Sequence, residues 1–202
     1  MKRRTFLASV IALPLLAQAA EEEFRPYRQV SRGADKARIY SFFSFACPVC
    51  RDYHRELEHW GKGVPKKMSF EMVPVVTAAD RPHMIAARAW YAVMKAAPEK
   101  SASFADAAYA LIHDQRMKLD DPETWIQACK ISGVRNFELA WKAVPVVEVT
   151  RATSLLKDYA ITETPSLAIG GRYVITPDNT QGDHRLFVQL ANGLASQALR
   201  SL

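Results

Sequence analysis

Cysteine is scarce in this chain, and its scarcity limits the chemistry that the residues can support. Three cysteines occur among the 202 residues, at positions 47, 50 and 129. A structural zinc site usually takes four cysteine or histidine ligands, and no second Cys-x-x-Cys pair accompanies the first. After Cys47 and Cys50, the nearest candidate ligand is His54. A metal site is therefore disfavoured, and we expect neither a metal nor another cofactor.

The first twenty residues, MKRRTFLASVIALPLLAQAA, lack an apolar run long enough to cross a membrane. A transmembrane helix needs about 20 apolar residues, and Pro14 interrupts this shorter run. A basic start at residues 2–4 and small residues at Ala17 and Ala19 are instead typical of a signal peptide. We expect residues 1–19 to direct export and to be cleaved off near Ala19. The same basic residues also resemble a twin-arginine signal, a less favoured alternative.

Basic clusters, repeats and low-complexity tracts are also missing. Removing the leader takes away three positive charges and lowers the formal net charge from +6 to +3. The remaining charges are scattered and form no basic run interleaved with aromatics, which argues against nucleic acid as a partner. A composition of 49% hydrophobic and 24% charged residues is typical of a folded globular protein.

The apolar pattern predicts an α/β fold with an all-helical insertion. Strands are expected at 37–45 and 68–76, with a short edge strand at 27–30 and a closing hairpin at 166–169 and 172–176 around Gly170-Gly171. Helices are expected at 48–61, where Gly61 marks the stop, and at 183–201. Residues 79–161 contain no convincing strand; the helices predicted there are 82–97, 103–116, 122–131, 136–144 and 146–159. These elements divide the mature chain into a first part at 20–78, a helical insertion at 79–158 and a second part at 159–202.

The Cys-Pro-Val-Cys pair follows a buried strand and opens a helix. Unpaired amides and the positive end of the helix dipole stabilise a thiolate at the first cysteine, Cys47, whereas Cys50 lies one turn further in. Pro48 suits the first helical turn, where its missing N–H costs nothing. A reactive dithiol is the favoured interpretation. A purely structural disulfide remains an alternative, but such a small loop would stabilise the fold little.

Two further side chains are candidates for chemistry. Cys129 shares a helical face with Trp125 and Ile126, which predicts a buried, inert thiol; a third reactive cysteine is the alternative. His54 lies one helical turn after Cys50 and is expected to be a surface or half-buried helix residue.

The segment Phe42-Phe43-Ser44-Phe45-Ala46-Cys47-Pro48-Val49-Cys50, followed much later by Thr164-Pro165, resembles the DsbA family of thiol:disulfide interchange proteins. That resemblance covers essentially the whole mature chain. It implies a thioredoxin-like fold with an inserted helical subdomain, a periplasmic location and a cis bond before Pro165, next to the cysteine pair. It also implies that Pro48, Val49, Thr164 and Pro165 support catalysis by Cys47 and Cys50.

The chain departs from the family pattern at two positions. The commonest form of the motif has histidine where Val49 stands, and valine offers the Cys47 thiolate neither a ring donor nor a positive charge. We therefore predict a less depressed Cys47 pKa and a milder oxidant than the strongest family members. Relatives also often carry a buried glutamate at the position of Ser41.

These residues favour an exported enzyme that donates the Cys47–Cys50 disulfide to folding secreted proteins. Its substrates would be reduced exported proteins, and the resemblance implies re-oxidation by a DsbB-type membrane partner; we expect a monomer. A reductase or isomerase on the same fold is one alternative. A non-catalytic metal-binding or chaperone-like module is another.

Overall fold

The computed structural model describes residues 25–76 and 80–202. The expected signal peptide and its cleavage position lie outside these residues. No helix in the described part of the chain is long and apolar enough to span a bilayer.

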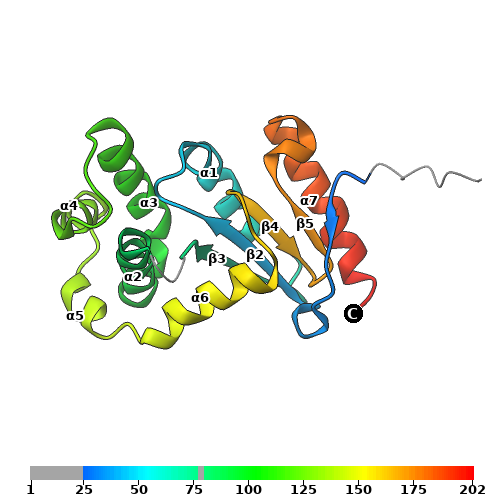
Figure 1. The fold of residues 1–202 in the computed structure, drawn as a ribbon, viewed down its shortest axis with the longest axis horizontal. Helices are drawn as coiled ribbons and strands as arrows, with labels where there is room; N and C mark the ends of the chain where they lie inside the picture. The colour runs from blue at the N-terminus through cyan, green and yellow to red at the C-terminus, as the bar shows by residue number, and fades with distance from the viewer. Residues whose placement is uncertain (1–24, 77–79) are drawn as a thin grey trace, which may run out of the picture.

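A five-stranded mixed sheet forms the centre of the molecule, in the order β1-β5-β4-β2-β3 (Figure 1). The strands are β1 (Arg28–Gln29), β2 (Arg38–Phe43), β3 (Ser69–Pro74), β4 (Ser166–Ile169) and β5 (Tyr173–Ile175). β2 runs parallel to β3, and the other pairings are antiparallel. Phe42 of β2 pairs with Ser166 of β4. This register brings the segment that follows β2 next to the segment that precedes β4.

The two faces of the sheet are covered by different helices. α1 (Pro48–Lys62) and α7 (His184–Leu199) pack on one face, where Ile39, Leu167 and Ile169 are buried with them. The side chains alternate along β2, so Tyr40 and Phe42 enter a second core on the opposite face. That second core includes the helices between β3 and β4.

The helical insertion consists of α2 (Arg81–Ala96), α3 (Ser101–Tyr109), α4 (Pro122–Ser132), α5 (Phe137–Lys142) and α6 (Val146–Asp158). In Figure 1, α2 to α5 gather beside the sheet and α6 runs back to it. Short 3-10 turns occur at Gly33–Asp35, Pro98–Lys100 and Pro177–Thr180. The helix predicted at 122–131 begins at Pro122, and its N-cap Asp121 accepts a hydrogen bond from the Glu123 amide at 2.9 Å.

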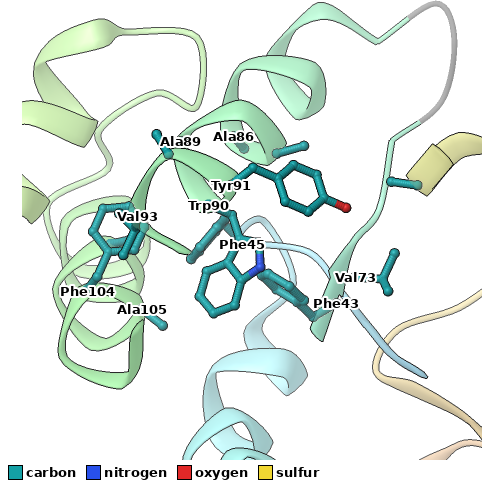
Figure 2. Close-up of a cluster of buried hydrophobic side chains, with 14 of the residues drawn as sticks. Phe43, Phe45, Val73, Ala86, Ala89, Trp90, Tyr91, Val93, Phe104 and Ala105 are labelled. Carbon is teal, nitrogen blue, oxygen red and sulfur yellow. The ribbon is translucent and has the colours of Figure 1, made fainter. Parts of the chain in front are cut away.

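Phe45 joins the sheet to the insertion. Its ring is 1% exposed and lies 5.2 Å, between centroids, from the rings of Phe43, Tyr109 and Trp125. Figure 2 shows Phe45 and Trp90 meeting where the α2 and α3 side chains converge on the end of β2. Phe45, two residues before Cys47, is therefore part of an aromatic cluster that joins the sheet to the insertion.

The predicted α/β fold with a helical insertion is confirmed, and the differences lie at element ends. α1 continues to Lys62 and is capped by Gly63, so the prediction that Gly61 ends the helix is wrong. Gly61 is buried against the Phe70 ring, which leaves no room for a Cβ atom. The helix predicted at 103–116 is α-helical only to Tyr109 and finishes as a π-helical turn, Ala110–Asp114.

Candidate active site

The cysteine pair lies at the junction between β2 and α1. β2 ends at Phe43, and a turn closed by the Cys47 amide and the Ser44 carbonyl, 3.1 Å apart, leads into the helix. Cys47 is the N-cap of α1 in an extended conformation, and its sulfur accepts a hydrogen bond from the Cys50 amide at 3.3 Å. Pro48 occupies the first helical position, as predicted. The backbone thus directs an unpaired helix amide at Sγ of Cys47.

Cys47 is partly exposed, and its surroundings favour the thiolate. A hydrogen bond from the Cys50 side chain makes the largest contribution and lowers the pKa of Cys47 to about 5; a hydrogen bond with Thr164 and the amides of Cys50 and Val49 act in the same direction. Burial opposes these effects. A thiol with this pKa is almost fully ionised at neutral pH.

Cys50 behaves in the opposite way. It is 1% exposed, and burial raises its pKa far above the ordinary thiol range, with further increases from its hydrogen bond to Cys47 and from the charge of that neighbour. All three cysteines are free thiols in the structure. The pair therefore combines one accessible, ionised sulfur with one shielded, protonated sulfur.

Thr164 and Pro165 lie directly beside the pair. The peptide bond between them is cis, as the family resemblance implied. In its protonated form the Cys47 thiol donates to the Thr164 carbonyl oxygen, with Sγ 3.2 Å from that oxygen. Pro165 is buried, whereas Val49 on the helix side is 41% exposed. The structure thus brings together all the candidate site residues that the sequence nominated.

An open cavity of about 340 Å³ adjoins Cys47. Its lining residues are Ser44, Ala46, Cys47, Val75, His83, Leu156, Ile161, Thr162, Glu163 and Thr164. Five parts of the chain contribute to it: the turn before α1, the residue after β3, the start of α2, the last part of α6 and the segment leading into β4. Such a cavity is large enough for one or two side chains of a bound peptide.

His83 and Asp80 were not nominated by the sequence, yet His83 lines this cavity and Asp80 contacts the His83 ring. Nε2 of His83 is 3.1 Å from the Ser44 hydroxyl, and Nδ1 is 2.6 Å from an Asp80 carboxylate oxygen. Asp80 is also the N-cap of α2 and accepts from the His83 amide at 3.3 Å. The Asp-x-Pro-His order signals a helix start, but no local pattern shows that this start faces Cys47.

His54 is buried, so its expected position at or near the surface is wrong. It is 5% exposed, its ring stacks on Tyr109, and Nε2 lies 2.7 Å from Asp106 of α3. Burial lowers the pKa of His54 to about 4, against the raising effect of Glu58. Asp106 is already paired with Arg55, so a neutral His54 ring can donate to it without needing a charge of its own.

Further contacts of the same kind join α1 to the α3 region. Arg51 makes a two-pronged ion pair with Asp114, at 2.7 and 2.8 Å, and the Ser101 hydroxyl donates to Glu58 at 3.0 Å. Together with the His54 and Arg55 contacts, these residues form the α1–α3 seam. The helix that carries Cys50 is therefore held against the insertion along several of its turns.

Ser41 is fully buried in β2, and its hydroxyl has no hydrogen-bond partner among the described residues. A glutamate at this position would be a buried acid, and serine cannot replace its proton chemistry. Residues 25–76 and 80–202 contain no group of three or more histidine, cysteine or acidic side chains placed to hold a metal ion.

The fold and the Cys-x-x-Cys pair define a thioredoxin-like protein, and the thioredoxin family model matches residues 28–186. A DsbA from Burkholderia cepacia is 31% identical over 163 residues, covering 79% of this chain and 74% of the relative. The crystal structure of Pseudomonas aeruginosa DsbA superposes with a TM-score of 0.73 at 17% identity, covering 87% of this chain and 93% of that one. A Proteus mirabilis DsbA variant, solved with a non-covalently bound peptide PWATCDS, has a TM-score of 0.69 at 19% identity, covering 85% and 96%.

The chain belongs to the DsbA family and is a thiol:disulfide oxidoreductase.

Proposed function

We propose that this protein is exported and donates the Cys47–Cys50 disulfide to folding secreted proteins. The contrast between the two sulfurs carries the proposal: Cys47 is partly exposed beside an open cavity and has a pKa near 5, whereas Cys50 is shielded and holds its proton. Stabilising the Cys47 thiolate stabilises the reduced protein, which makes the disulfide form the better oxidant.

The reaction has two exchange steps. A substrate thiolate attacks Sγ of Cys47 in the oxidised protein, forms a mixed disulfide and releases the Cys50 sulfur, which takes up a proton. A second substrate thiolate then attacks the substrate's own sulfur, and Cys47 leaves as a thiolate. The low pKa of Cys47 makes it a good leaving group, so the second step runs toward the oxidised substrate.

The supporting residues have distinct proposed roles. Pro48 sets the first turn of α1 and Val49 supplies an amide near the thiolate. Thr164 lines the cavity next to Cys47, and the cis bond to Pro165 sets the direction of its backbone, with which an extended substrate segment would pair. The peptide bound to the Proteus mirabilis protein contains a cysteine, which supports a peptide substrate here.

The proposed location is the periplasm, after cleavage of residues 1–19 near Ala19. The proposed substrates are reduced exported proteins, a DsbB-type membrane protein would restore the disulfide, and the protein would act as a monomer. The proposed division of the mature chain, at 20–78, 79–158 and 159–202, places the cysteine pair in the first part and Thr164-Pro165 in the last.

The equilibrium redox potential of the pair tests the direction of electron flow. The protein is equilibrated at pH 7 in buffers of reduced and oxidised glutathione, quenched with acid and alkylated, and its free thiols are counted by mass. We expect the pair to be reduced even in buffers that contain mostly oxidised glutathione. A pair that stays oxidised in strongly reducing buffer would overturn the donor role and favour a reductase. An isomerase would rearrange incorrect disulfides without net oxidation of its substrate.

A further inference from the structure

Three polar side chains, Asp80, His83 and Ser44, contact one another in that order at the wall of the cavity that Cys47 borders. Asp80 contacts Nδ1 of His83 at 2.6 Å, and Nε2 of the same ring lies 3.1 Å from the Ser44 hydroxyl. Ser44 and His83 both line the cavity that Cys47 and Thr164 border. The His83 side chain is 25% exposed and Asp80 34% exposed, so these contacts run from the partly open start of α2 into the cavity wall.

The charge of Asp80 sets the direction of proton transfer in the proposed relay. Its carboxylate lies 2.6 Å from Nδ1 without hydrogen-bond geometry, and its negative charge favours the tautomer with the proton on Nδ1, in which Nε2 accepts. The Ser44 hydroxyl must then donate to Nε2. Its oxygen already accepts from the Ala46 amide at 3.1 Å, which leaves one lone pair for another donor.

We propose that Asp80, His83 and Ser44 form a proton relay that deprotonates the incoming substrate thiol. The proposal rests on the donor function proposed above. It fills a gap in that mechanism, because the attacking group is a thiolate while an ordinary thiol, with a pKa of about 8.5, is only about 1% ionised at pH 6.5. Val49 and Ser41, the two departures from the family pattern, provide no group that could take this proton.

The position of His83 makes it the proton acceptor at this cavity. Asp80 contacts its ring, and Cys47 and Glu163 share the cavity; Val75, just after β3, and Leu156 of α6 are apolar. Cys47 is in the disulfide when the substrate attacks, so it cannot act as a base. Imidazole is the side chain most often used for general acid–base proton transfer in enzymes.

The attack on the disulfide conserves protons and electron pairs. The substrate S–H gives its proton to the Ser44 oxygen while the Ser44 proton passes to Nε2 of His83. The substrate sulfur uses its electron pair to bond to Sγ of Cys47, and the Cys47–Cys50 bond breaks with its electron pair on Cys50. Asp80 stabilises the imidazolium until its proton reaches the Cys50 thiolate or solvent. Ser44 contacts the substrate, and His83 and Asp80 act through it.

His83→Gln separates proton transfer from a structural role, because glutamine can keep a hydrogen bond to Ser44 but cannot accept a proton at neutral pH. The oxidised protein is mixed with a short synthetic peptide containing two thiols, in single turnover, and the products are trapped with acid. Rates are compared at pH 6.5 and pH 9.5. His184→Gln is the matched control, since His184 pairs with Glu56 at 3.1 Å and does not line the cavity. Glu163→Gln tests the other cavity acid.

We expect His83→Gln to slow transfer about tenfold at pH 6.5 and less than about twofold at pH 9.5, where the substrate thiol ionises unaided. Alkylation of reduced Cys47 and the thermal midpoint should match the wild-type protein, and His184→Gln should transfer at the wild-type rate at both pH values. Equal losses at both pH values, no loss at pH 6.5, or the same pH-dependent loss in Glu163→Gln would each overturn the relay while leaving the donor role intact. A wild-type protein that transfers at neither pH would overturn both proposals.

Discussion

Cys47 and Cys129 are the same side chain in two regions of one molecule, and their thiols have opposite properties. Cys47 stands at the start of α1, where amides and a second thiol lower its pKa to about 5. Cys129 lies inside α4, is 4% exposed, and burial raises its pKa to about 12. Reactivity here is decided by the position in the helix and by the hydrogen bonds available there. Cys129 is buried beside Trp125, as the sequence predicted.

The largest expected difference between the two regions is catalytic. Cys47→Ser should lower the rate of disulfide transfer to a reduced peptide at least about 10³-fold, because the sulfur that forms the mixed disulfide is gone. Cys129→Ala should keep the rate within about twofold and cost about 1 kcal/mol of stability for the lost buried sulfur. Single-turnover transfer and urea unfolding measure the two effects. A comparable catalytic loss in Cys129→Ala would show that Cys129 is not the inert thiol described above.

The next largest effect concerns the contact between the sheet and the helical insertion. Phe45→Ala removes a 1% exposed ring that touches aromatic side chains of both the sheet and the insertion, so the free energy of unfolding should fall by about 3–5 kcal/mol. Phe137→Ala in α5 is the matched control, because Phe137 is 9% exposed and lies at the edge of the same core. Urea denaturation of both variants gives the values. An equal or larger loss at Phe137 would contradict the central role of Phe45.

A smaller effect is expected in the pH dependence of alkylation. With iodoacetamide, the rate at Cys47 in the reduced protein should rise to a plateau with a midpoint near pH 5, while folded Cys129 stays unmodified through pH 8. At pH 5.5, Cys47 should react about 20-fold faster than a free cysteine, because its much larger thiolate fraction outweighs the lower nucleophilicity of a low-pKa thiolate. Mass spectrometry assigns the sites. A midpoint near 8.5 would remove the basis of the donor proposal.

The smallest predicted change comes from Val49→His. A ring next to the thiolate adds a donor and a partial positive charge, and it should lower the pKa of Cys47 by about half a unit to one unit, since the position is 41% exposed and solvent screens the interaction. Titration of thiolate absorbance in the reduced protein measures the shift. A Val49→Leu variant controls for side-chain size. An unchanged Cys47 pKa in Val49→His would show that valine in place of histidine does not weaken the stabilisation of the thiolate.

The sequence was most informative where a structural cause is local. The apolar run before Cys47, the proline at position 48 and the periodicity of α1 predicted a cysteine at a helix start, and the structure has that arrangement. His83 could not be predicted in the same way, because its contact with Ser44 spans 39 residues and depends on how α2 returns to the end of β2. The burial of His54 was missed for a similar reason: its partner, Asp106, belongs to a different helix.

The α1–α3 seam limits how this molecule can change shape when it engages a substrate. Arg51, His54, Arg55 and Glu58 fasten the helix bearing Cys50 to the insertion, so a rotation of the insertion as a rigid block would have to carry α1 along or break these contacts together. Cys47 and Thr164 are joined as well, because they follow and precede the paired strands β2 and β4, and Sγ of Cys47 lies 3.2 Å from the Thr164 carbonyl oxygen. A bound peptide should therefore meet a site in which Cys47 and Thr164 keep their separation, with both sulfurs held as one body with the sheet.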